Sequence, residues 1–231
     1  MPTAPRAPGP ALRAILLDID GTLLDSNDAH ARAWVTAFAD HGYVVPFDKV
    51  RALIGKGGDK LMPELTGLDP ESDDAKRISD SRARIFRERE LRSLKPTPGA
   101  RALLERLRAA GLELVVATSA QEDEVTALLT QAGIADLIKA AASSDDAERS
   151  KPDPDIIQAA LRKAGRQASQ SAMLGDTPYD VEAAIGARVP IVALRCGGWR
   201  DSALHGAAAV YDDPADLLAN FTRSPIGQAA G

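Results

Sequence analysis

Residues 14–22 of the chain read AILLDIDGT, and this stretch decides the fold. Its first half, from Ile15 to Leu17, is apolar on both faces of an extended segment, which is typical of a strand buried in a parallel sheet. Its second half is polar and contains Asp18 and Asp20. Because ligands bind at the carboxyl ends of the strands in open α/β sheets, the stretch predicts a buried strand that delivers two carboxylates to a binding site.

Similar apolar runs recur along the chain, and helical patterns separate them. The further strand candidates are residues 112–117, 138–142, 171–174 and 190–194, and helices are expected at 100–110, 122–132, 154–164 and 179–187. Strands that alternate with helices of this length predict βαβ units. The predicted fold class is therefore α/β, with a Rossmann-like parallel sheet core flanked by helices.

Residues 25–94 break this alternation, because their pattern is helical throughout. Helices are expected around 31–38 and at 48–54, 59–65 and 72–94, with no strand candidate between them. The sequence KPTPG at 95–99 then marks the return to the sheet. We therefore predict an α/β core formed by residues 1–24 and 95–231 and an inserted α-helical cap domain formed by 25–94. Residues 1–10 hold four prolines and are expected to be a disordered tail.

The composition is that of an ordinary soluble globular protein, since 45% of the 231 residues are hydrophobic and 26% are charged. A formal net charge of −5 argues against nucleic acid as the main partner. Residues 76–95 hold eight basic and three acidic side chains. We interpret this stretch as a solvated helix face rather than a nucleic-acid site.

The expected location is the cytoplasm. Cys196 is the only cysteine, so no disulfide can form within the chain, and a reducing compartment is favoured. No apolar run approaches the ~20 residues of a membrane-spanning helix, and the run that ends at Asp18 is too short for a secretory signal. We therefore expect no membrane partner, and the sequence specifies no oligomeric state.

Further polar residues follow the other predicted strands and should meet the two aspartates at one edge of the sheet. They are Thr118 and Ser119 after 112–117, Asp176 and Asp180 after 171–174, and Lys151 before the helix at 154–164. Carboxylates held close together repel one another unless a cation offsets their charge. Because no His or Cys cluster lies beside them, the ion expected to bind is one that prefers oxygen ligands, such as Mg²⁺. The metal, the lysine and nearby donors would then bind a dianion such as phosphate.

A pair of carboxylates two residues apart also suits phosphoryl transfer chemically. One can act as a covalent nucleophile and form an aspartyl-phosphate. The other can protonate the leaving oxygen and later activate water.

In its motifs, the sequence resembles the haloacid dehalogenase superfamily. The resemblance rests on DIDGT at 18–22, Thr118, Lys151 within SKPDP, and GDTPYD at 175–180, which stand in the order of that family's four motifs. It covers roughly residues 12–220. The helical insertion at 25–94 resembles the small cap of one branch, which includes phosphoglycolate phosphatases and β-phosphoglucomutases.

The resemblance implies a role for each matching residue. Asp18 would be the nucleophile and Asp20 the general acid and base. Mg²⁺ would be held by the carboxylates of Asp18 and Asp176 and by the backbone carbonyl of Asp20. Thr118 and Lys151 would bind the phosphoryl group, and Lys151 would also neutralise Asp18. Asp180 would lie just outside the metal's own ligands and fix the metal waters or Lys151.

For several residues, two alternative roles stay open. Asp180 either has that role or only caps the helix near 179, and Ser119 competes with Thr118 for phosphate. His30 either faces the cleft and helps to set the protonation of Asp20, as in the resembling mutases, or is an ordinary helix residue. Lys56, in the sequence GKGGD, either contacts substrate or is a solvated loop lysine. Cys196 is read as a loop or packing residue rather than a nucleophile.

The predicted function is a Mg²⁺-dependent phosphatase that hydrolyses a small phosphorylated metabolite through an aspartyl-phosphate. The alternative is a β-phosphoglucomutase-like sugar-phosphate mutase, although that branch usually has Glu at the position of Gly175 and an Arg in the cap loop near Lys56. A hydrolytic dehalogenase would lack the second aspartate, so Asp20 and Asp176 argue against it. A phospho-accepting signalling module would lack the helical insertion. Phosphoglycolate, sugar phosphates and nucleotides are all open as substrates.

Overall fold

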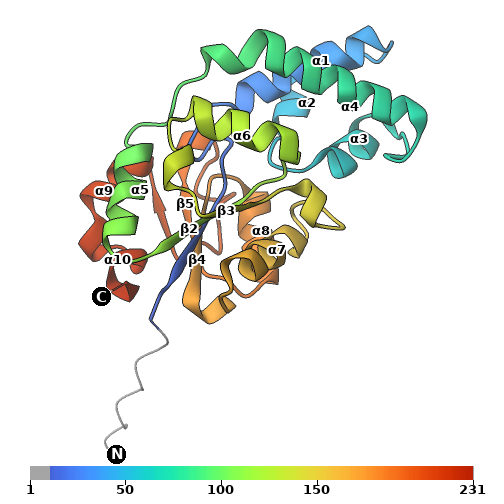
Figure 1. Cartoon of the computed structure of the whole chain (residues 1–231). Coiled ribbons are helices and arrows are strands. Elements are labelled where there is room, and N and C mark those ends of the chain that lie inside the picture. Colours follow the sequence, from blue (N-terminus) through green and yellow to red (C-terminus); the bar gives the residue numbers. More distant parts are fainter. Residues whose placement is uncertain (1–10, 231) are drawn as a thin grey trace, which may run out of the picture.

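The computed structural model describes residues 11–230, so the predicted tail at 1–10 lies outside the described residues. Six parallel strands form one sheet in the order β3-β2-β1-β4-β5-β6 (Figure 1). The strands are β1 (Ala14–Leu17), β2 (Glu113–Ala117), β3 (Ala140–Ala142), β4 (Ser171–Gly175), β5 (Ile191–Leu194) and β6 (Ala209–Tyr211). The predicted α/β fold with a parallel sheet is confirmed. The strand order reverses at β1, which is where open α/β sheets form their ligand crevice.

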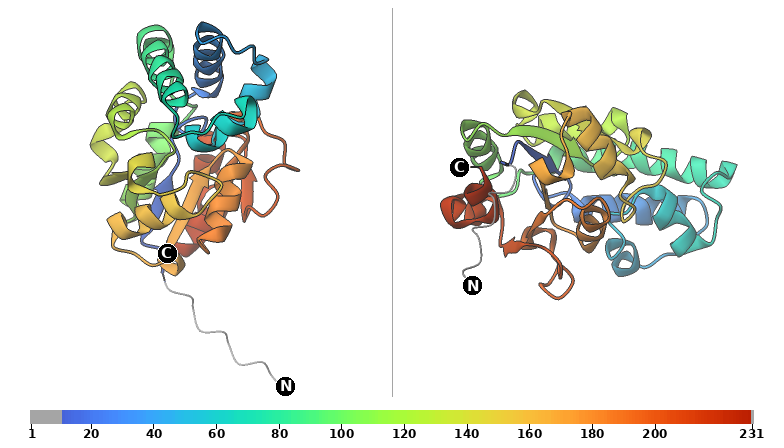
Figure 2. Two further views of the ribbon diagram at one scale, coloured as in Figure 1. Left: turned by 90° about the vertical axis from the view of Figure 1, so that its right-hand side faces the viewer. Right: turned by 90° about the horizontal axis from the view of Figure 1, so that it is seen from below.

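Both faces of the sheet are buried, as the apolar runs require. Ile15 and Leu17 pack into one apolar cluster, whereas Ala14 and Leu16 pack into the other. The first face is covered by α5 (Ala100–Ala109), α6 (Glu122–Gln131), α9 (Pro214–Ala219) and α10 (Pro225–Ala229). The second face is covered by α7 (Asp155–Ala164) and α8 (Pro178–Gly186), and the two layers are seen in Figure 2.

Four helices lie beyond the carboxyl ends of the strands, at the top of Figure 1. They are α1 (Asn27–Asp40), α2 (Phe47–Arg51), α3 (Gly58–Thr66) and α4 (Asp73–Ile85). The helix predicted at 72–94 changes its winding at Phe86, where α4 passes into a π-helical turn, η1 (Phe86–Glu90), and a 3-10 turn, η2 (Leu91–Ser93). Such turns are frequent at functional sites. Here the turn holds the buried Phe86 ring against His30, with ring centroids 4.0 Å apart.

The two segments that join these helices to the sheet run side by side. The backbone N–H of Asp25 donates to the carbonyl of Lys95 at 2.9 Å, and that of Thr97 donates to Leu23 at 3.1 Å. These pairings tie the two connecting segments to each other. The division into a core (1–24 and 95–231) and a cap (25–94) stays a prediction, and we use the word cap for 25–94 on that basis.

The chain after β5 was not predicted in detail. Strand β6 has only three residues, which is too short for an apolar run to stand out, and α9 and α10 are six and five residues long. Short 3-10 turns complete the connections at Ala135–Leu137, Ser144–Asp146, Ala168–Gln170, Arg195–Gly197 and Phe221–Arg223. Within residues 11–230, no helix is long and apolar enough to cross a membrane. The cytoplasmic location and the lack of a nucleic-acid partner stay predictions.

Candidate active site

The ends of β1 and β4 bring two of the predicted carboxylates together. The strands are paired with Leu17 opposite Leu174, and the N–H of Asp18 continues the ladder by donating to the carbonyl of Leu174 at 3.0 Å. Asp18 and Asp176 therefore follow adjacent strand ends. One oxygen from each of Asp18, Asp176 and Asp180 lies within 4.8 Å of the others, and all three residues are buried.

Lys151 is the buried cation of this cluster. Its ammonium lies 2.5 Å from Asp18 Oδ1 and 2.7 Å from Asp180 Oδ1. Burial works to lower the pKa of Lys151, but the two carboxylates outweigh burial and raise it, so the side chain stays charged. Lys151 thus lies where it can offset the charge of Asp18, a role that the family resemblance implies and that stays a prediction.

Asp180 makes contacts that fit each of its two predicted roles. Its Oδ2 accepts hydrogen bonds from the N–H groups of Asp176 at 3.3 Å and Thr177 at 3.0 Å, and so caps the N-terminus of α8. Its Oδ1 pairs with Lys151. Asp180 therefore fixes the lysine to the start of a helix.

Asp176 lies in a tight cradle. Thr22 Oγ1 donates to its Oδ1 at 2.8 Å, and Asn27 Nδ2 donates to its Oδ2 at 2.9 Å. Gly21 has a φ of +79° and, like Gly197, approaches the carboxylate so closely that a Cβ would overlap it. Only glycine combines this backbone conformation with this approach at position 21. The orientation of Asp176 is thereby fixed.

The three carboxylates of this cluster outnumber its one cation, Lys151. Burial raises the pKa of Asp18 well above its usual value, and repulsion from Asp180, Asp176 and Asp20 adds to this, although Lys151 opposes it. Burial and Asp180 likewise raise the pKa of Asp176 to about 7. Crowded oxygen donors with one lysine among them fit a hard divalent cation such as Mg²⁺. This donor set could therefore hold a divalent cation, and Mg²⁺ as that ion stays a prediction.

Asp20 lies in different surroundings from Asp18. Its Oδ1 is 2.8 Å from His30 Nε2 and accepts a hydrogen bond from Ser26 Oγ at 2.5 Å. Burial works to raise the pKa of Asp20, but the contacts with His30 and Ser26 outweigh it and lower the pKa. The pKa values of the two aspartates therefore shift in opposite directions, upward for Asp18 and downward for Asp20.

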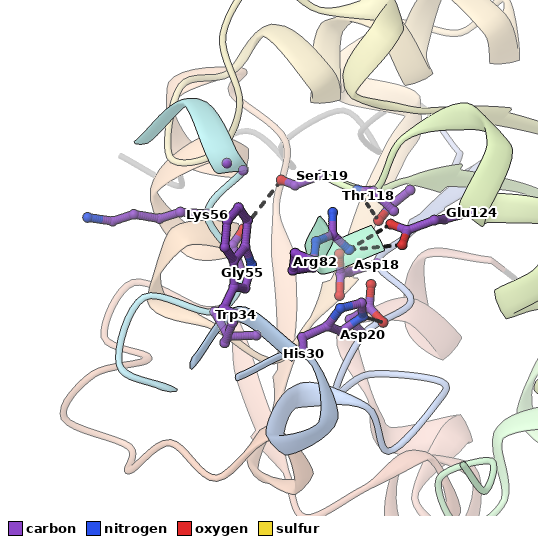
Figure 3. A pocket seen from close by; sticks show the side chains of 14 residues that line it. Asp18, Asp20, His30, Trp34, Gly55, Lys56, Arg82, Thr118, Ser119 and Glu124 are labelled. Atoms are coloured by element: carbon purple, nitrogen blue, oxygen red, sulfur yellow. Dashed lines mark hydrogen bonds and ion pairs between the residues drawn. The ribbon is translucent and has the colours of Figure 1, made fainter. Parts of the chain in front are cut away.

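A cavity of about 60 Å³ opens in front of these groups, between the cap and the sheet (Figure 3). Asp18, Asp20, His30, Thr118 and Ser119 line it on the core side and at the base of α1. The rest of its wall comes from Trp34, Ile54, Gly55, Lys56, Gly57, Gly58, Arg82, Ala120 and Glu124.

Contacts between cap and core close the cavity on several sides. Ser119 Oγ donates to the carbonyl of Gly55 at 3.3 Å, and the N–H of Gly57 donates to Ser150 Oγ at 3.1 Å. Ser150 Oγ also donates to Asp59. These contacts hold the glycine-rich cap loop against the carboxyl edge of the sheet.

Comparison with known proteins identifies this arrangement. A family model described as haloacid dehalogenase-like hydrolase matches residues 15–194. The chain belongs to this family. The chain is similar to a phosphoglycolate phosphatase of Rhodospirillum rubrum, with 34% identity over 219 residues that cover 89% of each chain. The family match and this relative indicate that the haloacid dehalogenase-like chain is a phosphatase, as the sequence predicts.

Solved structures agree with the fold of this hydrolase. A hydrolase from Pseudomonas syringae superposes with a TM-score of 0.84 at 31% identity, covering 91% of this chain and 98% of the other. CbbY from Rhodobacter sphaeroides, solved in complex with phosphate, superposes with a TM-score of 0.75 at 26% identity, covering 89% and 96%.

Thr118 and Lys56 also line the cavity, but their polar groups contact other parts of the protein. Thr118 is buried, and its Oγ1 accepts a hydrogen bond from the N–H of Ala120. Lys56 lines the cavity, but its ammonium lies 2.5 Å from Glu64 and 4.9 Å from the centroid of the Tyr179 ring. In Figure 3 this side chain points away from Asp18. A contact between Lys56 and substrate stays a prediction and would require the ammonium to leave Glu64.

Cys196 behaves as the sequence suggests. Its thiol donates to the carbonyl of Gly21 at 3.1 Å. Burial raises the pKa of the Cys196 thiol to about 12, with the charge of Asp176 adding to the effect. A thiol that stays protonated is a poor nucleophile, and this supports the packing role.

Sequence reasoning missed three residues of the site. Asn27 orients Asp176, and Arg82 of the cap forms an ion pair with Glu124 of α6 inside the cavity. Arg82 belongs to the basic stretch at 76–95 that was read as a solvated face, and for this residue the reading is wrong. The partner that draws it inward lies 42 residues away in sequence, so no local pattern signals the contact.

Proposed function

We propose that this hydrolase is a Mg²⁺-dependent phosphatase that forms an aspartyl-phosphate on Asp18. The observation that carries the proposal is the pairing of buried Asp18 with Lys151 at 2.5 Å, with Asp176 close by and with Asp18 and Asp20 both lining the cavity. A neutralised carboxylate can approach a phosphate dianion without strong repulsion, and phosphoryl transfer depends mainly on such positioning and charge stabilisation.

The residues that would hold Mg²⁺ are the carboxylates of Asp18 and Asp176 and the backbone carbonyl of Asp20. Asp180 is less suited as a ligand, because one of its oxygens is engaged by Lys151 and the other by the start of α8. When bound, the ion would stabilise negative charge on the phosphoryl oxygens.

The chain's own residues divide the reaction into two steps. Asp18 attacks phosphorus, and the bond between phosphorus and the leaving oxygen breaks while Asp20 gives that oxygen a proton. Thr118 and Lys151 hold the phosphoryl oxygens. Asp20 then takes a proton from water, which attacks the aspartyl-phosphate and releases inorganic phosphate, so that Asp18 is regenerated.

Phosphoglycolate is the substrate that we propose, because the relative from Rhodospirillum rubrum is named for this activity. Phosphate release from a panel of phosphorylated metabolites tests the choice. Phosphoglycolate should have the highest kcat/KM of the panel, and a preference for nucleotides or large sugar phosphates would contradict it.

The sugar-phosphate mutase is a second candidate because of the contact between His30 and Asp20. The resemblance gives mutases a histidine at this position. A mutase would convert β-glucose 1-phosphate to glucose 6-phosphate with little release of inorganic phosphate. Assaying both products in one reaction separates the two functions.

Metal removal should abolish activity. We expect no turnover in EDTA, full recovery on addition of Mg²⁺, and poor support by Ca²⁺, because Ca²⁺ takes more ligands at longer distances and can occupy both oxygens of Asp18. Phosphate release from phosphoglycolate measures each state. Full activity in the chelator would refute the metal assignment.

Replacing His30 by glutamine should shift the pH profile. His30 lowers the pKa of Asp20, so its loss should raise that pKa and leave less of the carboxylate form at any acidic pH. Since Asp20 must be ionised to activate water, the acid limb of the kcat profile should move to higher pH. An acid limb that stays in place while activity falls evenly would assign His30 a purely structural role.

A further inference from the structure

Arg82 occupies an unusual position for a side chain of a basic helix. It extends from α4 of the cap into the same cavity as Asp18 and Asp20 (Figure 3), and its side chain is only 11% exposed. A buried cation is costly unless it is paired. Its pairing must therefore explain why it lies there.

The pairing uses only part of the guanidinium. Nη1 donates both hydrogen bonds to Glu124, at 2.9 Å to Oε1 and 3.0 Å to Oε2. Nε is buried and has no hydrogen-bond partner within the described residues. Nε and Nη2 form the side-on edge of an arginine, whose two parallel N–H groups match the two oxygens of a carboxylate. This edge is not the one that Glu124 engages.

The plane of the guanidinium is also fixed. Arg82 Cζ lies 5.3 Å from the centroid of the Trp34 ring in α1, a distance that permits a cation–π contact. Trp34 and Glu124 come from cap and core respectively, so Arg82 is fully positioned only when the two are in contact. A pre-ordered donor edge with one buried N–H unpartnered is the arrangement expected for recognition of an anion.

Arg82 also brings a positive charge from the cap into the cavity. Lys56 lines the same wall, but its ammonium is held by Glu64. Because Asp18 and Arg82 line the same cavity, a substrate with its phosphoryl group at Asp18 can extend toward Arg82.

We infer that Arg82 is a specificity-determining residue that binds a carboxylate on the substrate, one or two bonds from the phosphate ester. This inference rests on the proposed phosphatase function and narrows its substrate class to phosphorylated short-chain acids. Glu124 is a positioning residue that holds Arg82 by Nη1 and leaves the Nε edge for the substrate.

The test compares phosphoglycolate with ethyl phosphate, in which a methyl group replaces the carboxylate. For the wild type, kcat/KM should be higher for phosphoglycolate by about 10–100-fold, the range expected for hydrogen bonds to charged groups. Arg82→Gln should lose that factor on phosphoglycolate and change ethyl phosphate by less than about 5-fold. Arg82→Lys, which keeps the charge but not the fork, should lose an intermediate part.

Arg87→Gln is the matched control. Arg87 also links the cap to α6, through Asp123 at 2.7 Å, but this pair is on the surface, with the two side chains 53% and 63% exposed. The variant should keep the wild-type kinetics on both substrates. Melting curves of all variants show whether the fold is retained.

Each remaining outcome decides the inference. Equal losses on both substrates in Arg82→Gln and Arg82→Lys, or no loss on either, would overturn it, as would a wild type that does not distinguish the two esters. If the wild type hydrolyses neither ester, the proposed function fails. Binding then decides: calorimetry on Asp18→Asn protein should show a preference for phosphoglycolate over ethyl phosphate that disappears when Arg82→Gln is added, and no preference would overturn the inference.

Discussion

Replacing Asp18 by asparagine should lower turnover by roughly 10⁴–10⁶-fold, the scale seen when a covalent nucleophile is removed. The carboxylate oxygen that would attack phosphorus is lost, while the shape of the side chain is kept. Phosphate release from phosphoglycolate measures the loss. Acid quench during turnover should detect no phosphate bound to the variant.

The fold should survive this change. Burial raises the pKa of Asp18 in the native state, so its ionisation opposes folding as pH rises above its ordinary pKa. A neutral asparagine removes that penalty, and Lys151 keeps its contact with Asp180. The melting temperature of the metal-free variant should therefore equal or exceed that of the wild type at neutral pH.

Asp25→Asn supplies the control for this variant. It makes the same chemical change at an exposed position of the same segment, and it should leave turnover unchanged. Asp18→Asn protein that keeps more than about a tenth of the activity would show that Asp18 is not the nucleophile.

The sheet could be predicted because its strands carry their own signal. Ile15 to Leu17 and the runs at 112–117, 171–174 and 190–194 are apolar on both faces, and only burial on both sides explains such runs. Strand β6 could not be found this way, because its three residues are only half-buried at the edge of the sheet. Its place depends on pairing with β5, which no local pattern records.

Some residues of the candidate site could be predicted from the sequence in the same way, and others could not. Asp18, Asp20, Asp176 and Asp180 follow strands directly, so topology alone brings them together. Arg82 reaches the cavity from α4, and the partners that orient it, Trp34 and Glu124, come from separate helices. Contacts of this kind depend on how the cap lies on the core, and the sequence contains no periodicity that reports it.

The second large effect concerns Asp20, which we assign to proton transfer. Asp20→Asn should reduce turnover of phosphoglycolate by about 10²–10⁴-fold, the usual contribution of general acid–base catalysis. The substitution should slow the two chemical steps to different extents. With an aryl phosphate, whose leaving group departs with little protonation, Asp18 should still be able to attack. Hydrolysis of the aspartyl-phosphate still requires a base to activate water, so the phosphorylated enzyme should accumulate.

Rapid acid quench followed by intact-mass measurement should then show an adduct of about 80 Da, the mass of one phosphoryl group, as expected for covalent catalysis by a carboxylate. Peptide mapping should place the adduct on Asp18, and Asp18→Asn should never acquire it. The lowered pKa of Asp20 favours its carboxylate form, which is the form that takes a proton from water in the second step. An adduct on a different residue would assign the nucleophile to that residue, whereas ¹⁸O from water entering phosphate without any phosphorylated enzyme would replace the covalent route with direct attack by water. In either case phosphatase activity itself would stand, because Lys151 and the ion that we propose for the carboxylate cluster would still stabilise the charge of the transferred group.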